Sequence, residues 1–204
     1  MHLFGSSAAK NAADKLQART ARASSGWAAL LKELGTGEGQ RVLDIGPTSS
    51  TNINFLTGLG HSVYMADLLG ELRDPRWAVA DGDEFATEAF VSANLDFSGR
   101  RFDTVLFWDA GDYMPIALRE AVVERIHQVM EPGGKLLALF HVKPDQEVQR
   151  YHLRDDGQVD IQFTGRTEQM SSLNNRQIEQ LFGRFSTYRF FLAKDNLREV
   201  LVTR

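Results

Sequence analysis

Polar residues that could bind a ligand follow the short apolar runs of this chain. Gly46, Asp67, Asp96, Asp109 and His141 each come at or just after a run of strand length. Carboxylates accept hydrogen bonds from hydroxyl and amino groups, and a histidine can take up a proton near neutral pH. If the runs form one parallel sheet, these residues share the edge at which such sheets bind ligands.

The stretch from Arg41 to Leu56 carries the clearest local signal. The apolar run Val42–Ile45 breaks at Gly46-Pro47, and helical spacing resumes at Ile53. This pattern predicts a strand, a tight turn and a helix. Because a helix N-terminus exposes unpaired backbone N–H groups, we expect a ligand above this turn.

Apolar runs alternate with segments of helical spacing through the first two thirds of the chain. The expected strands are Val42–Ile45, His61–Leu68, Val91–Phe97, Phe102–Asp109 and Lys135–Val142. The expected helices are Ala8–Ala23, Trp27–Leu34, one from the turn to about Leu59, and one from Pro115 to Val129. This alternation favours a doubly wound α/β sheet with helices on both faces.

The last third of the chain has a different pattern. Tyr151–Arg154 and Val159–Phe163 flank a turn sequence and predict a hairpin. Asn174 with Gln177 resembles a helix capping box. Ser186–Ala193 and Leu197–Thr203 predict a terminal antiparallel hairpin, which would bring the sheet to seven strands.

Size and composition narrow the class of protein. The 204 residues carry a net charge of −4, and 43% of them are hydrophobic. We expect a single domain over residues 27–204, preceded by a helical or flexible extension over residues 1–26. The acidic balance argues against a nucleic-acid partner. The absence of cysteine excludes disulfides and thiolate sites.

Location and metal content are also expectations from the sequence. No apolar run approaches the roughly 20 residues of a membrane span, and the first 25 residues lack the apolar core of a secretory signal. A cytoplasmic protein is therefore expected, with a transit peptide as the alternative. No metal site is expected, because His61, His127, His141 and His152 lack ligand spacing on a shared element.

Four motifs in order give the chain a family resemblance. They are Val42-Leu43-Asp44-Ile45-Gly46, the acid Asp67, Phe102-Asp103-Thr104-Val105-Leu106, and Glu131-Pro132-Gly133-Gly134-Lys135-Leu136. At these spacings, roughly residues 27–143 resemble the class I S-adenosylmethionine-dependent methyltransferases. The resemblance implies a Rossmann-like three-layer sandwich with a mostly parallel seven-stranded sheet and an antiparallel C-terminal hairpin. It also implies S-adenosyl-L-methionine as cofactor.

The resemblance assigns the cofactor-binding residues. Asp44 helps to hold the methionine ammonium, and Gly46 lets the backbone approach the ligand. Asp67 accepts hydrogen bonds from both ribose hydroxyls, with capping of the following segment as its alternative role. Asp96 meets the adenine amino group. If the third strand is misplaced, Asp81 or Asp83 takes that part instead.

The resemblance also places the methionine end and the acceptor beyond the fourth strand. Asp109, Trp108 and Tyr113 lie there, and an aromatic face beside a sulfonium gains cation–π stabilisation. His141, just past the core of strand five, is the best-placed base, and Tyr113 is the second catalytic candidate. His141 also has a purely structural alternative.

The turn departs from the family pattern of Asp-x-Gly-x-Gly-x-Gly. Thr48 and Ser50 stand where two glycines would be, and Pro47 removes one backbone donor. A Cβ at position 48 narrows the space for the methionine. The Thr48 and Ser50 hydroxyls can instead form hydrogen bonds with a carboxylate or cap the helix. The cofactor site at this turn is therefore either adapted to these residues or lost.

Three functions remain open from the sequence. The first is methyl transfer to a small-molecule acceptor. The second is a non-catalytic, methyltransferase-like binding or scaffold protein. The third is an α/β enzyme with another nucleotide, which the missing phosphate-binding glycine motifs oppose. The hairpin Tyr151–Phe163 and the N-terminal helix are free to cover the ligand site, and the two hairpins could pair in a homodimer.

Overall fold

Six strands form the main sheet of the computed structural model, which describes residues 14–37, 39–80, 83–191 and 195–204. The strand order is β3-β2-β4-β5-β9-β8. The bounds are β2 Arg41–Ile45, β3 Ser62–Ala66, β4 Phe102–Trp108, β5 Met130–His141, β8 Thr187–Phe191 and β9 Leu197–Thr203. The first four strands in this order are parallel, and β9 is antiparallel to both of its neighbours. The predicted α/β sheet with a terminal antiparallel hairpin is confirmed.

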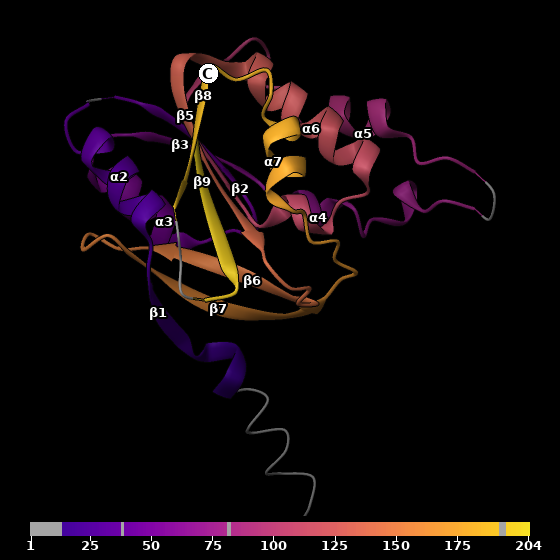
Figure 1. Cartoon of the computed structure of the whole chain (residues 1–204), viewed down its shortest axis with the longest axis horizontal. Coiled ribbons are helices and arrows are strands. Elements are labelled where there is room, and N and C mark those ends of the chain that lie inside the picture. The colour runs from indigo at the N-terminus through magenta and orange to yellow at the C-terminus, as the bar shows by residue number, and fades with distance from the viewer. Residues whose placement is uncertain (1–13, 38, 81–82, 192–194) are drawn as a thin grey trace, which may run out of the picture.

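Helices cover both faces of this sheet (Figure 1). α2 (Ser25–Leu34) and α3 (Ser50–Gly58) lie on one face, and α5 (Thr87–Asn94), α6 (Ile116–Val129) and α7 (Asn175–Leu181) lie on the other. The short elements are α4 (Leu68–Glu71), η1 (Pro75–Trp77) and η2 (Ala110–Tyr113). Each face buries its own hydrophobic core, one around Phe107 and Phe140 and the other around Trp27 and Leu106. The three layers follow from burying both sheet faces.

The helix boundaries follow from local chemistry. The Ser24 side chain accepts a hydrogen bond from Trp27 N and so starts α2, which buries Trp27, Leu30 and Leu34 along one side. Asn174 and Gln177 form the predicted capping box at the start of α7. The sequence predicted α2 from its apolar spacing and α7 from its capping box, and the Ser24 cap is a finding of the structure.

The predicted third strand, Val91–Phe97, is wrong. Residues 87–94 form α5. Phe90 and Leu95 are buried in the core that α6 also lines, and the partly buried Val91 packs against that core. A strand would send the neighbours Phe90 and Val91 to opposite faces, whereas a helix can bury both. The main sheet therefore has six strands within the described residues, and not the seven that were expected.

A second, three-stranded sheet has the order β1-β7-β6 and lies across the carboxyl ends of the parallel strands (Figure 1). The bounds are β1 Arg19–Ala23, β6 Glu147–Leu153 and β7 Gln158–Thr167, all pairing antiparallel. We call it the small sheet. Its β6–β7 pair is the predicted hairpin. An isolated hairpin is marginal in water, and β1 adds the third strand that stabilises it.

β1 contradicts the helix expected over Ala8–Ala23. Residues 8–13 lie outside the described residues, residues 14–17 are helical, and Arg19–Ala23 is extended and paired with β7. Ser24 caps α2 in an extended conformation, so the chain before it cannot continue that helix backward. Within the segment expected to be helical or flexible, Arg19–Ala23 is thus a strand of the small sheet.

A buried ion pair fastens the small sheet to the main sheet. Arg22 of β1 donates to Glu199 of β9, and its Nε lies 2.5 Å from Asp195 Oδ2. Glu199 is almost fully buried, and its second oxygen accepts from Gly26 N at 2.5 Å. The Trp27 indole N–H also donates to Arg154 O of the small sheet at 2.8 Å.

We predict that Arg22→Met lowers the free energy of unfolding by about 3–5 kcal/mol, because it leaves Glu199 buried and without its countercharge. Urea unfolding followed by circular dichroism measures this. The matched control is Arg154→Met, which removes only the partly exposed pairs with Asp156 and Asp160 and should change much less. Equal effects of the two substitutions would contradict the prediction.

Candidate functional site

The carboxyl ends of the parallel strands bring most of the predicted residues to one edge. Asp44 lies within β2 and Gly46 follows it, Asp67 follows β3, Asp109 follows β4, and His141 ends β5. Gly46 N donates to Ala66 O at 3.1 Å, which joins the turn after β2 to the end of β3. The predicted edge is therefore formed.

Asp44 is buried, and both of its carboxylate oxygens accept hydrogen bonds from the protein. Asn52 Nδ2 donates to Oδ2 at 2.9 Å, and the Trp108 indole N–H donates to Oδ1 at 2.6 Å. Burial raises the pKa of Asp44 to about 6, although these two hydrogen bonds favour the charged form. The carboxylate expected to bind an ammonium group is thus bound to internal donors.

The Trp108 indole fills the space beside Gly46. A Cβ on Gly46 would lie 3.1 Å from Cδ1 of Trp108. On its other side the indole stacks on Tyr151 of the small sheet, with ring centroids 4.9 Å apart and 8° between the planes. Trp108 is only 3% exposed. The space beside the glycine that was expected to let a ligand approach is thus occupied by a side chain of the protein itself.

The backbone at the end of β4 is unusual. The pairing register of β4 with β5 shifts between Leu106 and Trp108, which marks a bulge. Trp108 has φ +46°, in the left-handed region that residues with a Cβ rarely adopt. Bulges re-aim side chains at strand ends, and here the re-aimed side chain is the indole that covers Gly46.

Asp109 lies in a buried cluster with two tyrosines. The Tyr151 hydroxyl donates to Asp109 Oδ2 at 2.9 Å, and the Tyr113 hydroxyl lies 3.4 Å from the same oxygen and 3.1 Å from Glu147 O. Burial raises the pKa of Asp109 to about 6. Burial, and then the Asp109 charge, also raise the pKa of both tyrosines, which therefore remain hydrogen-bond donors.

His141 forms a buried pair with Asp112, a residue that the sequence did not single out. Asp112 Oδ2 accepts from His141 N at 2.6 Å and lies 3.1 Å from His141 Nδ1. Burial lowers the pKa of His141, but the hydrogen bond to Asp112 and the charges of Asp109 and Asp112 outweigh it and raise the pKa overall. His141 Nε2 is buried without a partner among the described residues. This fixed ring with one open nitrogen can hold or release a proton.

The turn after β2 uses a different hydroxyl from those expected. Thr48 and Ser50 are exposed, whereas Ser49 is buried. Ser49 Oγ accepts from Asn52 N at 3.1 Å and caps α3, and it lies 2.8 Å from His152 Nδ1 of the small sheet. Burial lowers the pKa of His152. Its Nε2 lies 2.7 Å from the acceptor Gln162 Oε1, so Nε2 carries the proton and Nδ1 of the neutral ring accepts a hydrogen bond from the Ser49 hydroxyl. Ser49 thus joins the turn to the small sheet.

Asp67 caps α4, which is the alternative role that the sequence left open. Its Oδ1 accepts from Gly70 N at 2.9 Å, and its Oδ2 lies 3.5 Å from Arg166 Nη2 of the small sheet. The carboxylate is partly exposed. Asp67 therefore occupies the predicted place at the end of β3 with one oxygen turned toward the small sheet.

Asp96 is not at this edge, so the prediction of its place was wrong. It is exposed in the turn between α5 and β4, and its Oδ1 accepts from Ser98 N at 2.9 Å. That turn leads into the amino end of β4, on the opposite side of the sheet. Asp81 and Asp83 were the alternatives for the adenine contact. Asp83 is exposed in the segment after β3, and Asp81 lies outside the described residues.

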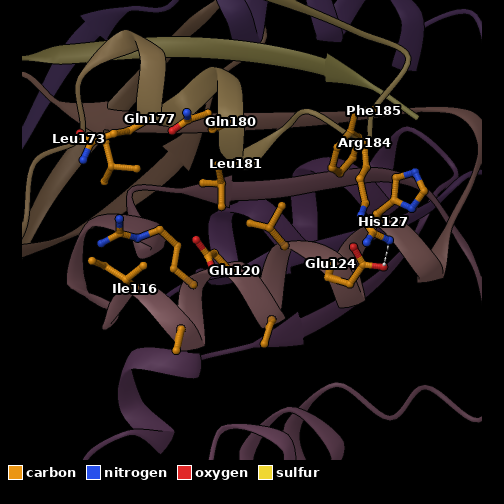
Figure 2. Close-up of a pocket in the computed structure, with 14 residues that line it drawn as sticks. Ile116, Glu120, Glu124, His127, Leu173, Gln177, Gln180, Leu181, Arg184 and Phe185 are labelled. Carbon is orange, nitrogen blue, oxygen red and sulfur yellow. Dashed lines mark hydrogen bonds and ion pairs between the residues drawn. The ribbon is translucent and has the colours of Figure 1, made fainter.

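A hollow of about 810 Å³ lies elsewhere, between α6 and α7. Figure 2 shows Glu124 and Arg184 paired across it, with Leu181 and Phe185 on the α7 side. The predicted site residues are absent from the described lining of this hollow. It belongs to the helix layer and not to the carboxyl edge of the sheet.

Comparison with known proteins gives the family. A match to the methyltransferase domain family covers residues 17–185. The chain belongs to this family. The match includes the small sheet as well as most of the main sheet, and it confirms the resemblance seen in the four motifs.

Individual relatives agree with this family. Ubiquinone/menaquinone biosynthesis C-methyltransferase UbiE of Shewanella oneidensis is 31% identical over 123 residues, which is 57% of this chain and 48% of that protein. The same enzyme of Shewanella sp. strain ANA-3 is 30% identical over the same shares. The chain thus spans about half the length of the curated relatives it matches.

One solved structure supports the fold. Magnesium protoporphyrin IX methyltransferase of Synechocystis PCC 6803, with bound SAM, superposes with a TM-score of 0.50 and 15% identity. The superposition covers 87% of this chain and 77% of that one. At this identity the likeness concerns the fold alone.

The two places that the sequence predicts for S-adenosylmethionine differ in the conformation seen here. Asp67, which is predicted to bind the ribose, is partly exposed at the end of β3. At the predicted methionine end, the Trp108 indole lies beside Gly46, and both oxygens of Asp44 are already hydrogen-bonded. Side chains of the protein therefore occupy the predicted methionine place in this conformation.

We predict that Asp109→Asn gains stability relative to the unchanged protein as the pH rises. Because burial raises the pKa of Asp109 from 3.8 to about 6, its contribution to stability is complete below pH 3.8 and is lost as the pH rises through 6. The asparagine keeps an acceptor for Tyr151 but cannot ionise. Between pH 4 and pH 7 the difference in unfolding free energy should grow by roughly 2 kcal/mol.

Urea unfolding at both pH values measures this difference. The control is Glu88→Gln, which replaces an exposed carboxylate on α5 and should show no comparable trend. A difference for Asp109→Asn that stays constant with pH would contradict the burial argument.

Proposed function

We propose that this protein is an S-adenosylmethionine-dependent methyltransferase that acts on a small-molecule acceptor. The observation that carries the proposal is the methyltransferase domain match over residues 17–185. The strand order β3-β2-β4-β5-β9-β8, with an acid after β3, supports it. The cofactor would supply an activated methyl group.

Asp67 is the residue that we assign to the cofactor ribose. It stands at the end of β3, and among the described residues the polar neighbour of its Oδ2 is Arg166 Nη2, 3.5 Å away. We assign Asp44, Gly46 and Asp109 to the methionine side, and Thr48 and Ser50 to the rim of the turn. Asp96 has no part in this assignment.

His141 is the residue that we assign to proton removal from the acceptor. Asp112 orients the ring through Nδ1, and the buried Nε2 needs a partner that a substrate group can provide. Tyr113 lies beside His141, with ring centroids 6.4 Å apart. Because its pKa is raised, Tyr113 can position an acceptor by donating a hydrogen bond.

The acceptor class follows from the shape of the edge. The small sheet covers the carboxyl ends of the strands (Figure 1), and the cluster at Asp109 is buried, which leaves little room for a macromolecule. The relatives named for quinone and porphyrin methylation act on small molecules. None of the described helices has the length and apolarity needed to cross a bilayer.

We predict that Asp67→Asn weakens the binding of S-adenosylhomocysteine by about tenfold or more. The amide can still cap α4, but it offers one acceptor in place of the two that a ribose diol uses. Isothermal titration calorimetry measures the affinity. The matched control is Asp74→Asn, a change in the acid that caps η1, which should leave the affinity unchanged.

Calorimetry can also overturn the proposed function. If the unchanged protein binds neither S-adenosylmethionine nor S-adenosylhomocysteine below millimolar concentration, and Trp108→Phe does not bind them either, the protein is not such an enzyme. The non-catalytic binding protein would then be the better description.

We predict that His141 titrates above its usual pKa of 6.5 and that Asp112→Asn lowers that pKa. The Asp112 carboxylate stabilises the charged imidazolium, and the amide does not. Histidine NMR of the folded protein measures the titration, with His141→Asn to assign the signal. His127 is the internal control, and burial lowers its pKa. If the pKa of His141 is the same in Asp112→Asn as in the unchanged protein, the pairing of His141 with Asp112 is contradicted.

A further inference from the structure

The Trp108 side chain lies at the place that we assign to the methionine end of the cofactor. Its Cδ1 is 3.1 Å from the position of a Cβ on Gly46, and its Nε1 is 2.6 Å from Asp44 Oδ1. Gly46 and Asp44 are the residues assigned to the methionine end. A ligand at that end and the indole in its present position exclude each other.

Two contacts hold the indole in this position. The Asp44 carboxylate accepts a hydrogen bond from its N–H, and the Tyr151 ring stacks on its face. The missing Cβ of Gly46 leaves room for its edge. Tyr151 is itself fixed, because its hydroxyl donates to Asp109 at 2.9 Å and its carbonyl accepts from Asn52 at 3.1 Å. The indole is thus clamped between the main sheet and the small sheet.

The backbone of Trp108 is strained in this arrangement. A residue with a Cβ at φ +46° persists only where its surroundings impose it, and such residues gather at ligand sites and switches. The bulge in β4 lies at the same point. Release of the indole would let the chain at Trp108 relax, so the strain favours movement once the Asp44 hydrogen bond is lost.

We propose that Trp108 is a gate that closes the methionine end of the cofactor site, and that the cofactor binds only after the indole has left Gly46 and Asp44. This inference rests on the proposed function. The structure shows the closed state, in which Trp108 stands in for the ligand. In the open state Gly46 and the Oδ1 of Asp44 become available.

A gate of this kind has a measurable effect on affinity. The apparent dissociation constant equals the intrinsic one divided by the fraction of open molecules. A variant that opens the gate therefore binds more tightly, although it has lost a large aromatic side chain. A residue that merely lined the site would show the opposite change.

The test compares the binding of S-adenosylhomocysteine to the unchanged protein, Trp108→Phe and Trp77→Phe by calorimetry. Trp108→Phe removes the hydrogen bond to Asp44 and keeps an aromatic ring in the core, and we expect at least tenfold tighter binding. Trp77→Phe is the matched control, because the Trp77 indole N–H has no described partner and lies outside the site. Its affinity should equal that of the unchanged protein.

A second measurement needs no change at Trp108. The protein labelled with 5-fluorotryptophan has three indole signals in its fluorine NMR spectrum, from Trp27, Trp77 and Trp108. Saturating S-adenosylhomocysteine should move the Trp108 signal, as the ring leaves Tyr151, by more than the other two. Trp77→Phe and Trp108→Phe assign the signals, and if Trp108→Phe does not fold, Trp27→Phe completes the assignment.

The outcomes separate the gate from the proposed function. Tighter binding by Trp108→Phe together with a moving Trp108 signal supports the gate. Equal or weaker binding by a folded Trp108→Phe, or a Trp108 signal that stays in place at saturation, overturns the gate while the methyltransferase assignment stands. Failure of both the unchanged protein and Trp108→Phe to bind either form of the cofactor overturns the proposed function itself.

Discussion

The arrangement of the ligand edge depends on one buried carboxylate. Asp44 is removed from water at the end of β2, and a buried charge must find donors within the protein. Asn52 and Trp108 supply them. The same Asn52 also bonds Tyr151 O and, through its own carbonyl oxygen, Leu153 N. Satisfying Asp44 therefore fixes the start of α3, the end of β4 and the course of β6 together.

The small sheet completes this edge by combining distant parts of the chain. β1 comes from the first quarter of the sequence, and β6 and β7 come from the segment after β5. The pair between Arg22 and Glu199 fastens one side of the sheet, and the Ser49–His152 contact fastens the other. Because Arg22 lies on β1 and His152 on β6, the two contacts depend on the arrangement of all three strands around β7.

The sequence predicted elements whose signal is local and missed those that depend on tertiary context. The strand from Arg41, the Asn174 capping box and both hairpins follow from apolar spacing and turn residues. Val91–Phe97 was misjudged because Phe90 and Val91 suit a strand or a helix, and only α6 decides between them. Asp112 was missed because it matters only through His141. The place of the Trp108 indole could not be foreseen, since it depends on a bulge and on a sheet far along the chain.

The core on the α2 side includes residues of the small sheet. Tyr151, Leu153 and Val159 are buried against the same apolar cluster as Trp27 and Leu30. If the small sheet swung away as a flap, this cluster would be exposed to water. The free-energy cost would be about 25 cal/mol for each Å² of apolar surface exposed. The small sheet is therefore expected to stay in place. In the proposed gate, entry of the cofactor at this edge depends on rotation of the Trp108 ring and not on movement of the small sheet.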